Sequence, residues 1–199
     1  MANKKNGFEF IDLALPSGTL WAATNVGAQK PTEAGLYFQW GDTVGYKAEQ
    51  VGKDKQFNQT DYKWHSDGEY TKYKTTGATL ELADDAANRY MGGSWHIPTP
   101  EQIQELIDNT TSNWVKLDNV NGRLFTSKNG KSIFIPAVGL AYYGSIRNTE
   151  WYGYIWSSML HGSSIDYGQF LYINSGSACL DCLDYYDRDF GMTVRGVIG

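Results

Sequence analysis

Apolar and polar positions alternate over short stretches through most of the chain, which predicts short β-strands joined by turns. Residues 20–22 and 35–40 are aromatic-rich runs bounded by turns that contain glycine or proline. Residues 123–126 and 132–135 flank an Asn-Gly pair at 129–130. Because Asn-Gly is the strongest signal for a two-residue turn, these two runs predict a hairpin.

Two stretches in the middle of the chain have helical spacing. In residues 80–91 apolar side chains recur on one face, and the glycine pair that follows ends the helix. In residues 99–109 Thr99 is placed to cap the helix, Pro100 suits the first helical position, and Gln102 completes a capping box. The expected fold class is therefore α+β, with two helices packed on a twisted, mainly antiparallel sheet and long loops between the elements.

The segment from about residue 42 to residue 79 is polar and rich in lysine, and aromatic residues are scattered through it. This composition predicts a long, mostly irregular insertion that its aromatic side chains hold against the rest of the protein. The chain has no repeat of fixed period and no linker, so residues 1–199 are expected to form a single domain. Trp95, Ile103 and Trp156 are expected in its core.

Charge and hydropathy argue against two classes of function. The chain has 199 residues, a formal net charge of -5 and no basic run, whereas a nucleic-acid-binding protein needs a cationic surface. No apolar run reaches the roughly 20 residues of a membrane-spanning helix, and no apolar segment of signal-peptide length follows the first residues. We therefore expect neither nucleic-acid binding nor membrane insertion, and no signal peptide in the chain as it stands.

The composition changes abruptly after Lys131. Residues 1–131 contain twelve lysines, seven glutamines and seven glutamates, whereas residues 132–199 contain no lysine, one glutamine and one glutamate. A codon with two randomised bases followed by a pyrimidine encodes none of these residues, and such codons arise when the adenines of asparagine codons are mutated. The depletion therefore fits adenine-directed diversification of residues 132–199. A preference of loops for Gly, Ser, Asp and Tyr is the alternative explanation.

Seven motifs are spread along most of the length of the chain: residues 11–27 (IDLALPSGTLWAATNVG), 37–41 (YFQWG), 84–87 (DDAA), 92–99 (GGSWHIPT), 134–139 (FIPAVG), 156–158 (WSS) and 194–195 (VR). With these motifs the chain resembles a family of gut-bacterial and phage proteins that have the C-type-lectin-like fold of the formylglycine-generating-enzyme type. The GGSWxxPT block is quite specific. The chain departs from the family at Gly196, where relatives often carry proline.

The resemblance implies a variable protein of a diversity-generating retroelement, in which a reverse transcriptase rewrites C-terminal codons and the lectin fold displays the result. It implies a non-catalytic binding domain on a phage tail fibre or a bacterial cell surface, with a protein or glycan receptor on a target cell as its partner and no cofactor. Residues 1–131 would be the invariant scaffold and residues 132–199 the diversified region. In such a fold, strands near residues 8–13 and 192–197 lie close together and close the domain.

Tyrosines interleaved with serine and aspartate give the region after residue 139 the composition of an antibody paratope. We expect several loops on a rigid scaffold to bring these side chains to one exposed, fairly flat face. Three arginines stand against six acidic residues in 132–199, which favours a neutral or basic partner surface. The candidate binding residues are Tyr142, Tyr143, Arg147, Asn148, Tyr154, His161, Ser163, Ser164, Asp166, Tyr167, Tyr172, Cys179, Asp181, Cys182, Asp184, Tyr185, Tyr186, Asp187 and Asp189.

The Cys179–Cys182 pair and the aspartates of residues 181–189 leave alternatives open. A structural zinc site needs four ligands and a redox motif needs a strand-to-helix context, so two cysteines produced by codon variation, free or bridged, are favoured. An oxidase of the formylglycine-generating kind that uses this pair is the enzymatic alternative. A calcium-dependent glycan-binding lectin that uses the aspartates is the third hypothesis, although the Glu-Pro-Asn and Gln-Pro-Asp motifs of such lectins are absent.

Overall fold

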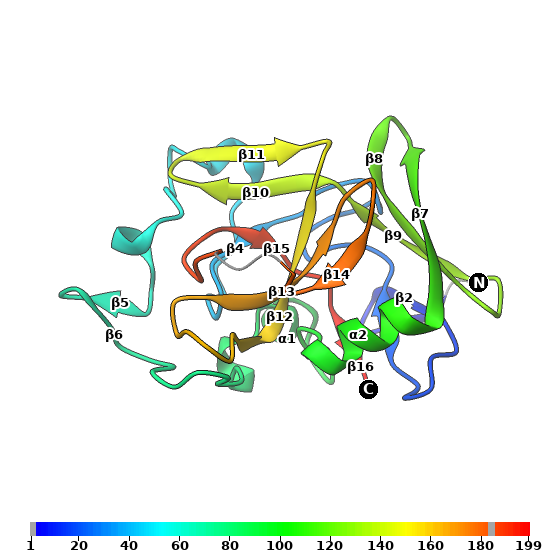
Figure 1. Ribbon diagram of the computed structural model, residues 1–199, viewed down its shortest axis with the longest axis horizontal. Helices are drawn as coiled ribbons and strands as arrows, with labels where there is room; N and C mark the ends of the chain where they lie inside the picture. The colour runs from blue at the N-terminus through cyan, green and yellow to red at the C-terminus, as the bar shows by residue number, and fades with distance from the viewer. Residues whose placement is uncertain (1–2, 183–185) are drawn as a thin grey trace.

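The computed structural model describes residues 3–182 and 186–199, and a five-stranded sheet lies at its centre (Figure 1). Its strands are, in order, β14 (Ala178–Leu180), β13 (Gly168–Ile173), β12 (Gly153–Leu160), β15 (Met192–Thr193) and β4 (Tyr37–Phe38). Neighbouring strands are antiparallel except β12 and β15, which are parallel. Most of this sheet therefore comes from the last third of the chain.

A second sheet joins the two ends of the chain. Its strands are, in order, β1 (Lys4–Lys5), β2 (Phe8–Asp12), β3 (Leu20–Ala22) and β16 (Val197–Ile198). The expected proximity of the terminal strands is confirmed, with β3 between β2 and β16. The single strand expected over residues 192–197 is wrong, because β15 and β16 join different sheets on either side of Arg195. The Arg195 side chain is fully buried, and its guanidinium donates to the carbonyls of Ala22 and Phe134 at 3.0 and 2.9 Å.

A three-stranded antiparallel sheet contains the expected hairpin. Its strands are, in order, β7 (Thr110–Leu117), β8 (Val120–Ser127) and β9 (Ser132–Pro136). The hairpin of β8 and β9 is confirmed, but its loop is longer than two residues: only Gly130 has a left-handed φ, at 80°, and Asn129 Oδ1 accepts the Lys131 N–H at 2.9 Å. The two-residue turn lies between β7 and β8, where Asp118 and Asn119 have φ of 47° and 66°.

Helix α2 (Pro100–Asn109) begins where the sequence predicts. The Thr99 hydroxyl accepts the Gln102 N–H at 3.3 Å, and the Gln102 amide oxygen accepts the Thr99 N–H at 2.9 Å. Ile103 and Leu106 are fully buried, and the helix contacts β12, β13 and β14. The local capping signals were therefore sufficient to place this helix.

The helix expected over residues 80–91 is wrong in its first half. A 3-10 turn (Leu82–Asp84) is followed by the shorter α1 (Ala86–Met91), because Asp85 between them has an extended backbone. Its buried carboxylate accepts the N–H groups of Asn88 at 2.9 Å and Ile97 at 2.8 Å, so Asp85 caps α1 instead of continuing a helix through it. No helix in the described part of the chain has the length and apolar character needed to cross a bilayer.

The insertion of residues 42–79 is mostly irregular. Its elements are η1 (Ala48–Gln50), η2 (Gln59–Asp61), β5 (His65–Ser66) and β6 (Glu69–Tyr70). Phe57 and Tyr62 are buried, and the Tyr62 hydroxyl donates to the Trp40 carbonyl at 2.7 Å. The insertion also holds the tip of the hairpin formed by β10 (Val138–Tyr142) and β11 (Ser145–Thr149), where the Gly144 N–H donates to the Gln56 carbonyl at 2.6 Å.

Two hydrophobic clusters cover the two faces of the central sheet. On β12 and β13, Trp156 and Phe170 belong to one cluster, whereas Ile155 and Leu171 belong to the other, as the alternation of side chains along a strand requires. The first cluster includes Trp95, and α2 contributes Ile103 to the second. Trp95, Ile103 and Trp156 are at most 1% exposed, which confirms them as core residues.

Candidate functional site

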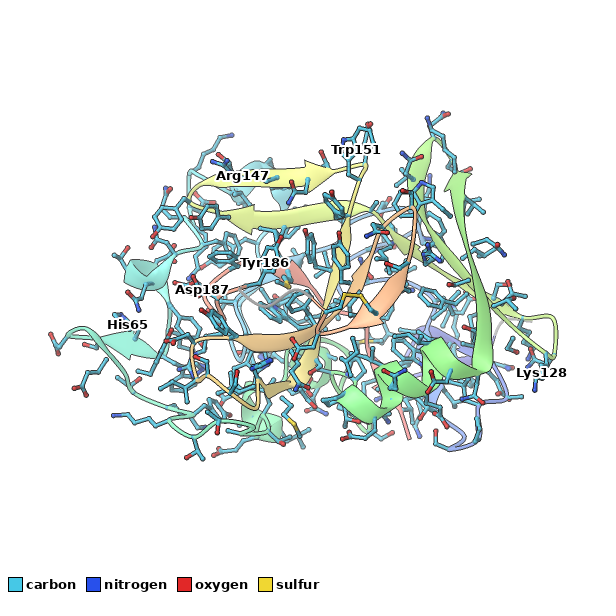
Figure 2. All side chains as sticks on the ribbon, viewed as in Figure 1. His65, Lys128, Arg147, Trp151, Tyr186 and Asp187 are labelled. Carbon is cyan, nitrogen blue, oxygen red and sulfur yellow. A yellow bond between two sulfur atoms is a disulfide. The ribbon has the colours of Figure 1, made fainter. Side chains whose placement is uncertain are left out.

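An uninterrupted row of aromatic side chains crosses the Trp156 face of the central sheet. Successive ring centroids lie 4.4–6.0 Å apart along this aromatic row, from β10 through the segment after residue 185 to β12 and β13. Figure 2 shows Tyr186 in this row, below the β10–β11 hairpin and above β13. The row consists of Tyr143, Tyr142, Phe190, Tyr186, Tyr154, Tyr172 and Tyr152.

The burial of two tyrosines in the row shows that part of the sequence prediction is wrong. Tyr154 and Tyr172 are only 1% and 6% exposed, so they are not exposed contact residues. Tyr154 lies two positions from Trp156 on β12, and Tyr172 lies two positions from Phe170 on β13, so each pair faces the same side of the sheet. All four side chains pack in the same hydrophobic cluster. Burial raises the pKa of Tyr154 far above its ordinary value. Tyr142, Tyr152 and Tyr186 are half-buried and Tyr143 is 60% exposed, so the row has a buried floor and an accessible top.

Polar side chains at the edge of the row hold the tyrosine rings in place. The Asn174 amide donates to the Tyr172 hydroxyl at 3.1 Å, and the Asn148 amide lies 3.4 Å from the Tyr154 hydroxyl. The hydroxyls of Tyr154 and Tyr186 are 3.3 Å apart. The guanidinium of Arg147, on the exposed strand β11, lies 5.6 Å from the centre of the Tyr142 ring. The face is therefore amphipathic and pre-organised.

The loop of residues 161–167 forms a second group beside the row. His161 Nδ1 accepts both the backbone N–H and the hydroxyl of Ser163, at 3.1 and 2.7 Å, so the ring proton is on Nε2, which lies 3.1 Å from the Asp181 carboxylate. Tyr167 pairs with Asp187 in an isolated bridge, and the Ser164 hydroxyl donates to Asp166 at 2.8 Å. The segment 186–190 contacts this loop and also belongs to the aromatic row, so the two groups form one continuous region.

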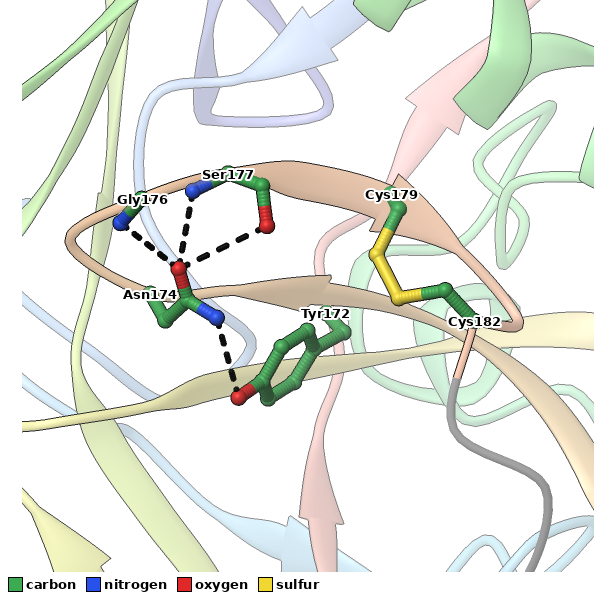
Figure 3. The surroundings of a disulfide bond; sticks show 6 residues. All are labelled: Tyr172, Asn174, Gly176, Ser177, Cys179 and Cys182. Atoms are coloured by element: carbon green, nitrogen blue, oxygen red, sulfur yellow. Dashed lines mark hydrogen bonds between the residues drawn. A yellow bond between two sulfur atoms is a disulfide. The ribbon is translucent and has the colours of Figure 1, made fainter.

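Cys179 and Cys182 form a disulfide at the end of β14 (Figure 3). Cys179 pairs with Tyr172 of β13, and Cys179 packs against the cluster that contains the aromatic row. Figure 3 also shows Asn174, whose side-chain oxygen accepts the N–H groups of Gly176 and Ser177 at 2.7 and 2.8 Å and thereby orders the turn between β13 and β14. The disulfide answers the question that the sequence left open between free, bridged and metal-bound cysteines.

The calcium-binding alternative rests on the aspartates of residues 181–189. Within residues 3–182 and 186–199, no group of three or more acidic, histidine or cysteine side chains is placed to hold a metal ion. Asp189 is a further correction, because it is 5% exposed and does not reach the surface of the face. Asp184 and Tyr185 lie outside the described residues.

Two of the three arginines in residues 132–199 are fully buried, so they add no positive charge to the surface. Arg195 lies between the sheets, and Arg188 donates to the carbonyls of Lys72 and Tyr73, each at 2.9 Å, and of Ile165 at 3.2 Å. Only Arg147 is exposed. The accessible surface of this region is therefore more acidic than its sequence predicts.

Several residues of the face were absent from the sequence prediction. Tyr152 and Phe190 complete the aromatic row, and Trp151, which Figure 2 shows at the turn after β11, is 70% exposed. Tyr152 follows Trp151 directly, and tryptophan is a residue that the randomised codon does not encode, so the composition of this turn does not indicate a diversified position. Tyr152 is two positions before Tyr154, so the period of two along a strand is the signal that would have placed it on the same face.

Comparison of the chain with protein-family models, with curated proteins and with solved structures gives no match.

Proposed function

We propose that this protein is a non-catalytic recognition domain with a C-type-lectin-like fold of the formylglycine-generating-enzyme type, diversified by a retroelement over residues 132–199. The observation that carries the proposal is the aromatic row. Side chains far apart in sequence, from Tyr142 to Phe190, meet in one continuous region, and all of them follow the change in composition at Lys131. The partner is a protein or glycan receptor on a target cell, and the domain is carried on a phage tail fibre or a bacterial surface.

The fold keeps the aromatic row apart from the elements that form the scaffold, as a recognition domain requires. The sheet of β1, β2, β3 and β16 brings the two ends of the chain together, and α2 packs against the central sheet on the face opposite the aromatic row. Hydrogen bonds from Asn148 and Asn174 fix the hydroxyls of Tyr154 and Tyr172 at the edge of the row. A rigid aromatic surface with a polar edge loses little conformational entropy on binding, which is why tyrosine-rich surfaces serve as paratopes.

Sequencing of sibling copies of the gene tests the retroelement origin. We expect substitutions confined to residues 132–199, at codons that derive from asparagine codons by changes of adenine. The exposed positions Tyr143 and Arg147 should vary, and Cys179 and Cys182 should vary too. Substitutions spread evenly over the chain would contradict diversification. Cysteines held constant at 179 and 182 while their neighbours vary would favour the oxidase, and constant aspartates at 181, 184 and 187 would favour the calcium-dependent lectin.

A further inference from the structure

A pocket of about 350 Å³ lies between the insertion and the 161–167 loop. Such a volume is at the small end for organic ligands and suits a single side chain. One wall comes from the region that we propose to be constant and the other from the region that we propose to be diversified. Its lining includes Gln59, Glu69, Tyr70, Lys74, Ile165 and Asp166.

The carboxylates of Glu69 and Asp166 line this pocket. Asp187 and Asp189 do not line it, but Asp187 is close enough to Asp166, and Asp189 to Asp187, for their charges to interact. Asp166 accepts a hydrogen bond from the hydroxyl of Ser164 at 2.8 Å, and burial together with the charge of Asp166 raises the pKa of Tyr70. Burial and the charge of Asp166 raise the pKa of Asp187, and burial together with the charge of Asp187 raises the pKa of Asp189 to about 7. The fold thus brings carboxyl groups of like charge together, an arrangement that costs stability and is typical of functional sites.

The protein supplies little positive charge to offset these carboxylates. In the described residues, no lysine or arginine forms an ion pair with Asp166, Asp187 or Asp189. Arg188 is close enough to lower the pKa of Asp189, but its guanidinium is buried 3.6 Å from the centre of the Tyr70 ring and donates to backbone carbonyls. Asp189 Oδ1 is buried and has no hydrogen-bond partner among the residues that the structure describes. An external cation would relieve the repulsion that remains.

We propose that this pocket receives an arginine or lysine side chain of the partner, which identifies the partner as a protein with a cationic contact surface. The inference rests on the recognition function proposed above and names the chemistry of its ligand. Asp166 and Glu69 supply carboxylates, Gln59 an amide oxygen, and Tyr70 and Ile165 apolar surface for the stem of the side chain. Charge complementarity of this kind sets partner choice and association rate, and arginine is enriched among residues that dominate binding energy.

Among the described residues that line the pocket, Lys74 is the one basic residue. Its ammonium lies 4.0 Å from Glu69 Oε2, and the two side chains are 59% and 82% exposed. An exposed pair of this kind contributes little to stability, so an incoming cation displaces Lys74 at small cost. Lys74→Ala should therefore tighten binding of a cationic probe.

The experiment is a titration of ¹⁵N-labelled protein, followed by NMR, with the capped peptide Gly-Ser-Arg-Ser-Gly and with its lysine and glutamate counterparts. The arginine and lysine peptides should shift the amide signals of Tyr70, Ile165 and Asp166, and the glutamate peptide should not. Asp166→Asn should weaken binding about tenfold, the usual effect of removing a charged hydrogen-bond partner. Asp108→Asn is the matched control, since it removes an exposed carboxylate at the end of α2 and should leave binding unchanged.

Absence of these shifts, or equal binding by Asp166→Asn and the unaltered protein, overturns the proposal. So does a titration with calcium chloride alone that shifts the same amides, because the site would then belong to a metal ion. Unchanged amide signals outside the pocket verify that the variants are folded. If the peptides do not bind but exchange of residues 140–189 still transfers the target, only the cationic ligand is refuted. If the peptides bind and the exchange fails, the proposed function falls instead.

Discussion

Trp156→Ala should lower the free energy of unfolding by about 3–5 kcal/mol, the range for truncation of a large aromatic residue in a core. The indole is 1% exposed and packs edge-on against Phe170 with ring centroids 6.1 Å apart. Its Nε1 donates to the Phe38 carbonyl at 2.7 Å, a bond that joins β12 to β4 across the short strand β15. The variant therefore loses packing and leaves a buried carbonyl unpaired.

Urea denaturation of Trp156→Ala and Trp151→Ala gives a matched comparison. Trp151 is five positions earlier and 70% exposed, so its removal should change the free energy of unfolding by no more than about 1 kcal/mol. The difference in unfolding free energy between the two variants measures the contribution of burial at Trp156, because the same side chain is removed in both. A larger loss for Trp151→Ala would mean that the division into core and accessible face is wrong.

Asp189→Asn should stabilise the protein by about 2–4 kcal/mol above pH 7 and leave its stability nearly unchanged near pH 4. Burial and the charge of Asp187 raise the pKa of Asp189 from 3.8 to about 7 in the folded state. The folded protein therefore holds this proton more tightly than the unfolded chain does. Its stability gains a contribution as pH falls from about 7 to 4 and loses that contribution as pH rises through the same window. Asparagine has the same shape and no charge to bury.

Urea midpoints of Asp189→Asn and of the unaltered protein between pH 4 and pH 8 test this linkage. The stability difference should grow by up to about 1.4 kcal/mol per pH unit across the window and be constant above it. Asp108→Asn, at an exposed position, should show no such growth. A difference for Asp189→Asn that is independent of pH would contradict a buried carboxyl group at this position.

Local signals in the sequence predicted local structure well. Thr99, Pro100 and Gln102 were sufficient to place α2, because capping involves only neighbouring backbone groups. The prediction of one helix over residues 80–91 was wrong because the Asp85 carboxylate accepts the N–H of Ile97, twelve positions away. Helical periodicity carries no information about such a contact. Strand β7 was not predicted, since its alternating exposed and half-buried residues carry little apolar pattern.

The sequence predicted which residues belong to the candidate site but not how deeply each of them is buried. Trp156 was expected in the core, and Tyr154 two positions earlier on the same strand shares its face, so the burial of Tyr154 followed from a period of two. The burial of Arg188 and Arg195 did not follow from any local pattern. Most of their partners are backbone carbonyls more than 60 positions away, such as Tyr73 for Arg188 and Ala22 and Phe134 for Arg195. Only the folded chain brings these groups together.

Exchange of residues 140–189 for those of a sibling protein tests the central claim most directly. The chimaera, both parents and their binding to a panel of target cells are measured together, with thermal melts to verify folding. The account predicts that the chimaera melts like its parent and acquires the target of the sibling, because the exchanged segment carries the whole aromatic row except Phe190. A folded chimaera that keeps the original target would contradict it and would place recognition elsewhere, in the insertion of residues 42–79.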